Sequence, residues 1–124
     1  MKRTFLLLGS LMAFFGVALG AFGAHGLKDF LPLEMLTVFE TAVRYHLYHA
    51  FAILIIAVLV EKIPMAEHAG RLFGLGILLF SGSLYLLSLT GIRSFGMITP
   101  IGGLCFLGGW GVLLYAGFKM AKEN

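Results

Sequence analysis

Residues 42–60 read AVRYHLYHAFAILIIAVLV, and this stretch decides the fold class. Its second half is an unbroken apolar run, whereas its first half carries Arg44, His46 and His49. A helix of about 20 predominantly apolar residues is long enough to cross the hydrocarbon core of a bilayer. Three further runs of this kind occupy residues 5–24, 72–90 and 101–118. The sequence therefore predicts an all-α integral membrane bundle of four transmembrane helices, folded as one domain over residues 1–124.

The composition agrees with a bilayer location. Charged residues make up 12% of the chain, against about 25% in soluble proteins. The net charge of +3 is not gathered into a basic face interleaved with aromatic residues, so the sequence argues against nucleic-acid binding. The lone Cys105 lies inside an apolar run and is interpreted as a small buried apolar group, because the chain offers it no disulfide partner.

The first span has an alternative interpretation as a secretory signal peptide. Lys2 and Arg3 precede an apolar stretch that ends in small residues, as in a charged region, an apolar region and a cleavage site. The run is of spanning rather than signal length, however. Gly16, Gly20 and Ala24 also form a ridge of small residues of the kind that packs against another helix. We therefore favour a retained transmembrane helix.

The distribution of lysine and arginine predicts the orientation, because positively charged loops are retained on the cytoplasmic side. With the N-terminus inside, the inner set is Lys2, Arg3, Lys62, Arg71, Lys119 and Lys122. The outer set is then Lys28, Arg44 and Arg93. The larger inner set predicts that both termini are cytoplasmic.

Residues 25–41 form the predicted outer loop, and they leave two arrangements open. Pro32 suits the first turn of a helix, where its missing N–H costs nothing. The segment after it forms either an amphipathic helix at the membrane surface or a helix that continues straight into the second span. Thr99 before Pro100 predicts the start of the fourth helix, with the threonine side chain as its cap.

Polar side chains are concentrated in the outer half of the predicted bundle. A periodicity of about 100° per residue places Glu40 and Arg44 close together as an i, i+4 pair, and His49 nearly opposite Glu40. Ionisable groups cost about 2.5–3.5 kcal/mol each at the centre of a bilayer, so they pair or face a cavity. Two interpretations stay open: these residues form interhelical bonds and interfacial anchors, or they line a polar pocket.

Known catalytic and metal-binding patterns do not fit these residues. No glutamate stands three residues before His46, as a di-iron bundle requires, and His46 and His49 lack the zinc-hydrolase spacing of four. No motif supports haem ligation by His25 together with His46 or His49. Nor does one mark a hydrolase site built from Ser88, His49 and Glu40. The sequence therefore predicts no metal and no cofactor, and it favours a non-enzymatic role over a membrane-embedded enzyme or a haem-binding subunit.

Four stretches carry a family resemblance: GAFGAHGLK at 20–28, TAVRYHLYHA at 41–50, LFSGSLYLLSLTG at 79–91 and ITPIGGLCFLGGW at 98–110. Together, in order and over nearly the whole chain, they resemble the small inner-membrane family of unknown function that includes YwdK and YgdD. Eukaryotic transmembrane protein 256 is a distant relative of that family. The resemblance implies a multi-pass protein of the bacterial inner membrane with no established activity, and it supplies no catalytic residues.

The family stretches and the outer half of the bundle share a set of polar residues, which we interpret as a candidate pocket. Arg44 suits an anionic headgroup or a carboxylate, whereas histidine, tyrosine and serine side chains can form a proton path. We predict binding of a small anionic molecule or a lipid headgroup; the alternative is an accessory or scaffold subunit without ligand chemistry. The predicted partners are the lipid bilayer and further copies of the chain in a homo-oligomer. The candidate residues are His25, Glu40, Arg44, Tyr45, His46, His49, Ser81, Ser83, Tyr85 and Thr99.

Overall fold

The described chain is helical throughout its four long segments. A computed structural model describes residues 2–123, with side chains from 3 to 120. Four helical segments in this range are long and apolar enough to cross a membrane, which confirms the predicted fold class. They are α1 (Lys2–His25), α2 (Leu33–Leu59), the continuous α3 (Ala66–Gly76), η1 (Ile77–Ser81) and α4 (Gly82–Thr90), and finally η2 (Arg93–Met97) with α5 (Thr99–Glu123). The side chains of Lys2 and Lys122 and residue Asn124 lie outside this description.

Helix α2 begins well before the predicted start at residue 42. Pro32 stands immediately before it, and from Leu33 the chain continues straight into the second span, so that no separate surface helix forms. The hydroxyls of Thr37 and Thr41 donate to the carbonyls of Leu33 and Thr37, each at 3.0 Å. These local bonds satisfy the two threonine hydroxyls, and the helix continues through these residues without a break.

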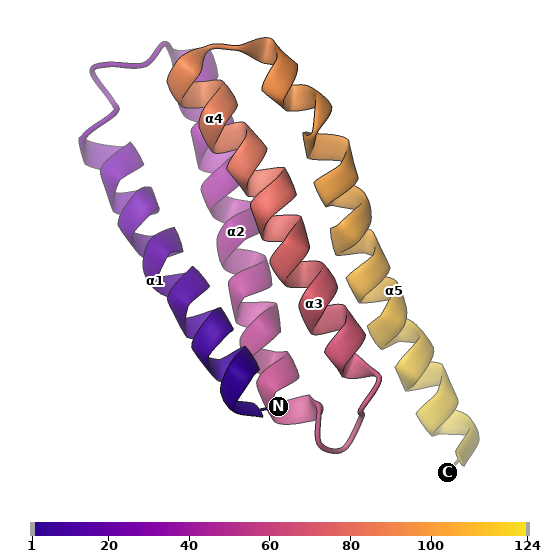
Figure 1. The fold of residues 1–124 in the computed structure, drawn as a ribbon. Helices are drawn as coiled ribbons and strands as arrows, with labels where there is room; N and C mark the ends of the chain where they lie inside the picture. The colour runs from indigo at the N-terminus through magenta and orange to yellow at the C-terminus, as the bar shows by residue number, and fades with distance from the viewer. Residues whose placement is uncertain (1, 124) are drawn as a thin grey trace.

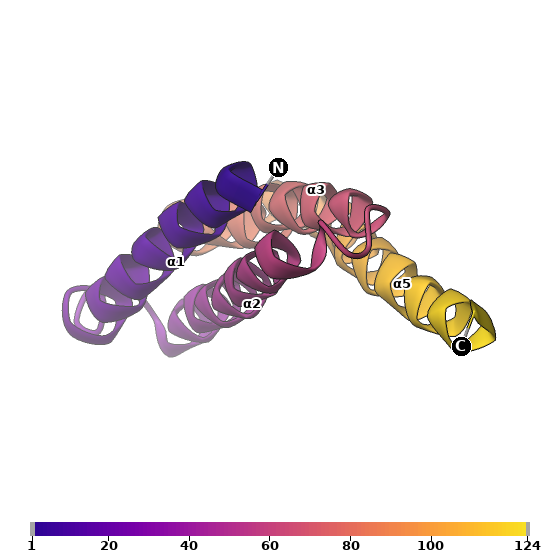
Figure 2. The ribbon, with the colours of Figure 1, turned by 90° about the horizontal axis from the view of Figure 1, so that it is seen from below.

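The helices run alternately up and down, and both ends of the chain lie at the same end of the bundle (Figure 1). We call this the terminal end, and the opposite one the far end. Helix α1 packs mainly on α2, while α5 packs mainly on α3 and η1. Seen from below, α5 diverges from α1 and α2, so the four segments form an open arch rather than a closed bundle (Figure 2). The apolar core lies between α2 and α3, around Ile53, Ile56 and Phe73.

Small residues permit two of the closest helix approaches. A Cβ added to Gly16 of α1 would lie 2.6 Å from the side chain of Leu47 on α2, in agreement with the predicted ridge. A Cβ added to Gly102 of α5 would collide with the backbone of Phe80 in η1. Because lipid supplies no hydrophobic force between helices, such close contact is a main source of their association.

Candidate functional site

His46 joins three helices near the middle of the structure. Its Nε2 lies 2.7 Å from the carbonyl oxygen of Met12 in α1, and its Nδ1 lies 2.8 Å from the hydroxyl of Tyr85 in α4. A carbonyl only accepts, so Nε2 carries the proton, and Nδ1 of the neutral ring accepts from the tyrosine. One buried side chain therefore holds α1, α2 and α4 together.

His49 makes the corresponding bond between α2 and α5. Its Nδ1–H donates to the carbonyl of Tyr45 at 2.7 Å, and its Nε2 accepts from the indole N–H of Trp110 at 3.0 Å. The imidazole also stacks on Phe106, with ring centroids 3.6 Å apart. These partners fix a neutral ring with the proton on Nδ1, because a proton on Nε2 would abolish the bond to Trp110. Neither nitrogen is free to bind a metal in this arrangement.

Hydroxyl groups complete the interior network. Ser81, the last residue of η1, donates to the carbonyl of Ala42 in α2 at 2.7 Å. Ser83 of α4 and Thr99 of α5 share a hydrogen bond of 2.6 Å. Thr99 thus begins its helix as predicted, but its hydroxyl binds another helix instead of capping its own. Every buried side-chain nitrogen or oxygen in the described part of the chain has a hydrogen-bond partner.

The far half of the α1–α2 interface contains a pocket of about 300 Å³, which we call the α1–α2 pocket. Glu40 and Arg44 supply its charges, and neither has a hydrogen bond or ion pair within residues 3–120. The predicted pair between them is therefore not formed. The rest of the lining is apolar: Gly20, Gly23, Ala24, Phe39, Val43 and Leu47.

A second pocket, of about 380 Å³, lies between α2, η1 and α5 on the other side of α2. We call it the aromatic pocket. Its lining carries no charged side chain, because His49 is neutral as described above. Its lining is Tyr45, His49, Phe80, Pro100, Gly103, Leu104, Phe106, Leu107 and Trp110.

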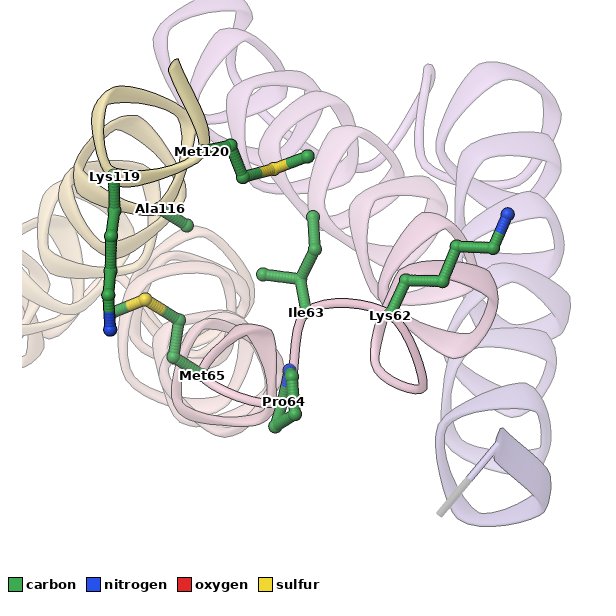
Figure 3. Close-up of a pocket in the computed structure, with 7 residues that line it drawn as sticks. All are labelled: Lys62, Ile63, Pro64, Met65, Ala116, Lys119 and Met120. Atoms are coloured by element: carbon green, nitrogen blue, oxygen red, sulfur yellow. The ribbon is translucent and has the colours of Figure 1, made fainter. Parts of the chain in front are cut away.

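A third pocket, of about 410 Å³, lies at the terminal end between the α2–α3 turn and α5. It holds Lys62 and Lys119, which the sequence analysis used only for orientation. Lys119 lies alongside Met65, whereas Lys62 extends away from both (Figure 3). The two ammonium groups do not converge on a common point, so this pocket is not our candidate site.

The structure divides the predicted site residues among separate places. Glu40 and Arg44 line one pocket, Tyr45 and His49 line another, and His25 is exposed at the end of α1. The other five form the interior network: His46, Ser81, Ser83, Tyr85 and Thr99. Sequence reasoning missed Trp110 and Phe106, because it searched for ionisable groups and these rings lie in a glycine-rich apolar span.

The described residues gather no cluster of three or more histidine, cysteine, aspartate or glutamate side chains that would hold a metal ion. The arrangement instead offers the α1–α2 pocket, the aromatic pocket and an interior whose polar side chains are hydrogen-bonded. A family model described as a protein of unknown function (DUF423) matches residues 19–103. The chain belongs to this family.

Relatives from distant bacteria match almost end to end. The membrane protein YwdK of Bacillus subtilis is 45% identical, over 94% of this chain and 98% of its own. A membrane protein of Haemophilus influenzae is 42% identical, over 96% of this chain and 97% of its own. No solved structure matches the chain. The family assignment confirms the resemblance seen in the sequence and establishes a small membrane protein of unknown function.

Proposed function

We propose that this protein binds a membrane lipid, or another amphiphile with an anionic group, in the α1–α2 pocket. The observation that carries the proposal is that Arg44 and Glu40 line this pocket without a partner in the described chain, while every buried polar side chain is satisfied. The proposal includes the orientation inferred from charge, with both termini in the cytoplasm of a bacterial cell. The pocket then opens toward the outer leaflet of the inner membrane.

The depth of Arg44 supports a ligand. It lies about 22 Å from Leu59, the last residue of α2, at about 1.5 Å per residue along the helix axis. Because the hydrocarbon core is about 30 Å thick, the Cα of Arg44 lies inside it, near the far end. An unpaired charge there is costly, and an anionic group at Arg44 offsets that cost. The guanidinium fork suits phosphate and carboxylate oxygens, which it binds through two parallel hydrogen bonds.

The order of the two charges narrows the ligand class. Glu40 lies one helical turn beyond Arg44 toward the far end, and therefore nearer to water. A phospholipid with a phosphate below and an amine above meets the arginine and the carboxylate in that order. A phosphoethanolamine headgroup is thus the best complement among phospholipids, and the apolar residues Gly20 and Val43 line the pocket beside it.

Native mass spectrometry of the detergent-released protein, after exchange into equal parts of phosphatidylethanolamine and phosphatidylglycerol, tests the proposal. We expect one retained phospholipid, enriched in the ethanolamine form. Arg44→Ala removes charge-assisted bonds and should lower affinity about 10- to 100-fold. Glu40→Gln should retain a lipid but lose the preference for ethanolamine.

The matched control is Arg93→Ala. Arg93 lies at the same end of the molecule, but it is exposed, pairs with Glu34 at 3.4 Å and lines neither the α1–α2 pocket nor the aromatic pocket. Equal lipid retention by the wild type, Arg44→Ala and Arg93→Ala would show only bulk lipid and would overturn the proposal.

The orientation has its own test. A green fluorescent reporter fused after Asn124 should fluoresce, and alkaline phosphatase fused at the same place should be inactive, since the first works in the cytoplasm and the second outside it. The opposite pattern would place the α1–α2 pocket in the inner leaflet.

A scaffold role is the second candidate, and the saturated interior favours it. His46, His49 and Ser81 each hydrogen-bond to a neighbouring helix, which is how an accessory subunit without ligand chemistry would use them. Co-purification of a stoichiometric partner with both the wild type and Arg44→Ala, with no retained lipid in either, would select this candidate.

A further inference from the structure

We propose that the aromatic pocket between α2, η1 and α5 binds the flat ring of a lipid-soluble quinone. This site is separate from the α1–α2 pocket and does not rest on the function proposed above. More than half of its lining residues carry planar aromatic rings, and they come from three helical elements: Tyr45, His49, Phe80, Phe106 and Trp110.

The orientation of these rings favours a planar guest. The His49 and Phe106 rings already stack, 3.6 Å apart and 8° from parallel. The Tyr45 ring is close to parallel with both, at 11° and 17°, but its centroid lies 6.3 Å and 6.4 Å away. Tyr45 is therefore a third nearly parallel ring, displaced from the closely stacked pair. A flat ring gains from such aligned faces, whereas a flexible acyl chain does not need them.

The Tyr45 hydroxyl can form a hydrogen bond with a ligand in the aromatic pocket. The Tyr45 hydroxyl has no hydrogen-bond partner within the described residues, whereas the Trp110 N–H is used by His49. A quinone carbonyl accepts such a bond. The lining of the pocket carries no charged side chain, which a phospholipid headgroup would require. The pocket therefore suits a flat, apolar ligand that carries a hydrogen-bond acceptor.

Location and size agree with this ligand. Tyr45 follows Arg44 in α2, so it also lies in the half of the bilayer nearer the far end. Helices α2 and α5 diverge from each other (Figure 2) and meet mainly through His49, Phe106 and Trp110. A ligand dissolved in the bilayer can therefore enter from the side. The volume of about 380 Å³ falls within the range of small-molecule pockets, about 300–1,000 Å³.

The single tryptophan of the chain lines this pocket and serves as the probe. Titrating the purified protein in detergent with a decyl-substituted benzoquinone should quench Trp110 fluorescence with saturation at one quinone per chain. Gly103→Leu fills the pocket and should leave only the linear, collisional quenching expected in micelles. The substitution leaves the backbone packing intact, because a Cβ at Gly103 meets only the Phe80 ring, at 3.9 Å.

A pair of tyrosine variants tests the hydroxyl. Tyr45→Phe removes one hydrogen bond and should weaken binding about 2- to 10-fold. Tyr48→Phe removes the hydroxyl of a neighbouring exposed tyrosine that does not line the pocket, and it should bind like the wild type. Arg44→Ala should also bind normally, since its side chain lines the other pocket.

Three results would overturn the proposal. Linear quenching of equal slope in the wild type and Gly103→Leu would show that no site exists. Recovery of fluorescence with excess phosphatidylethanolamine would identify an acyl-chain site instead. Equal affinities of the wild type, Tyr45→Phe and Tyr48→Phe would show that the Tyr45 hydroxyl binds no quinone carbonyl, and would overturn the assignment of a quinone.

Discussion

Helix α2 presents two contrasting faces, one toward α1 and one toward α5. Toward α1 it carries Glu40 and Arg44, which are ionisable and have no partner in the described chain. Toward α5 it carries His49, which is neutral and bonded at both ring nitrogens. Bonds to backbone and indole groups satisfy neutral polar groups inside the protein, whereas a full charge needs a counter-charge. The contrast separates residues that hold the fold from residues that are available to a ligand.

The largest expected effect comes from the interior junction. His46→Ala deletes hydrogen bonds to Met12 and Tyr85 together with a buried ring. Interhelical bonds in membranes contribute about 0.6 kcal/mol on average and up to about 1.7, so the free energy of unfolding should fall by about 1–3 kcal/mol. Chemical unfolding in detergent followed by circular dichroism measures it. His25→Ala, at an exposed position, should change nothing; comparable effects of the two substitutions would remove the structural role of His46.

A smaller effect is expected at the α5 side of α2. Trp110→Phe removes a single hydrogen bond and leaves Nε2 of His49 without its donor. A double-mutant cycle with His49→Phe should give a coupling free energy of about 0.6–1.7 kcal/mol. The same unfolding measurement supplies all four corners. A coupling near zero would mean that the α2–α5 contact depends on ring packing alone.

The smallest effect on stability is expected at the α1 side. In lipid-free detergent, Arg44→Ala and Glu40→Gln should each alter the free energy of unfolding by less than about 0.5 kcal/mol, because neither side chain has a partner to lose. Their effects should also be additive. A coupling free energy between Glu40 and Arg44 as large as that between His49 and Trp110 would reveal an ion pair. The two faces of α2 would then not differ in this respect.

The sequence predicted the helices more completely than the site. Hydropathy alone located four spans, since the length and apolar character of each run are local properties. The helical wheel already separated Glu40 from His49, but it did not show that α1 covers one side of α2 and α5 the other. That assignment depends on where helices approach, as at Gly102 and Phe80. Trp110 had no local signal, because the residues that it contacts, His49 and Phe73, lie in other helices.

The π turn of η1 determines which way the side chains of α4 face. It holds one residue more than a regular α-helical path, which rotates α4 by about 100° relative to α3. Residues before the turn, such as Phe73, face the apolar core, and Tyr85 after it reaches His46. Deleting one residue between 77 and 81 would leave hydropathy and composition almost untouched. It would nevertheless rotate α4 by about 100°, so that Tyr85 would face away from His46. The number of residues in the third span therefore sets which way the side chains of α4 face.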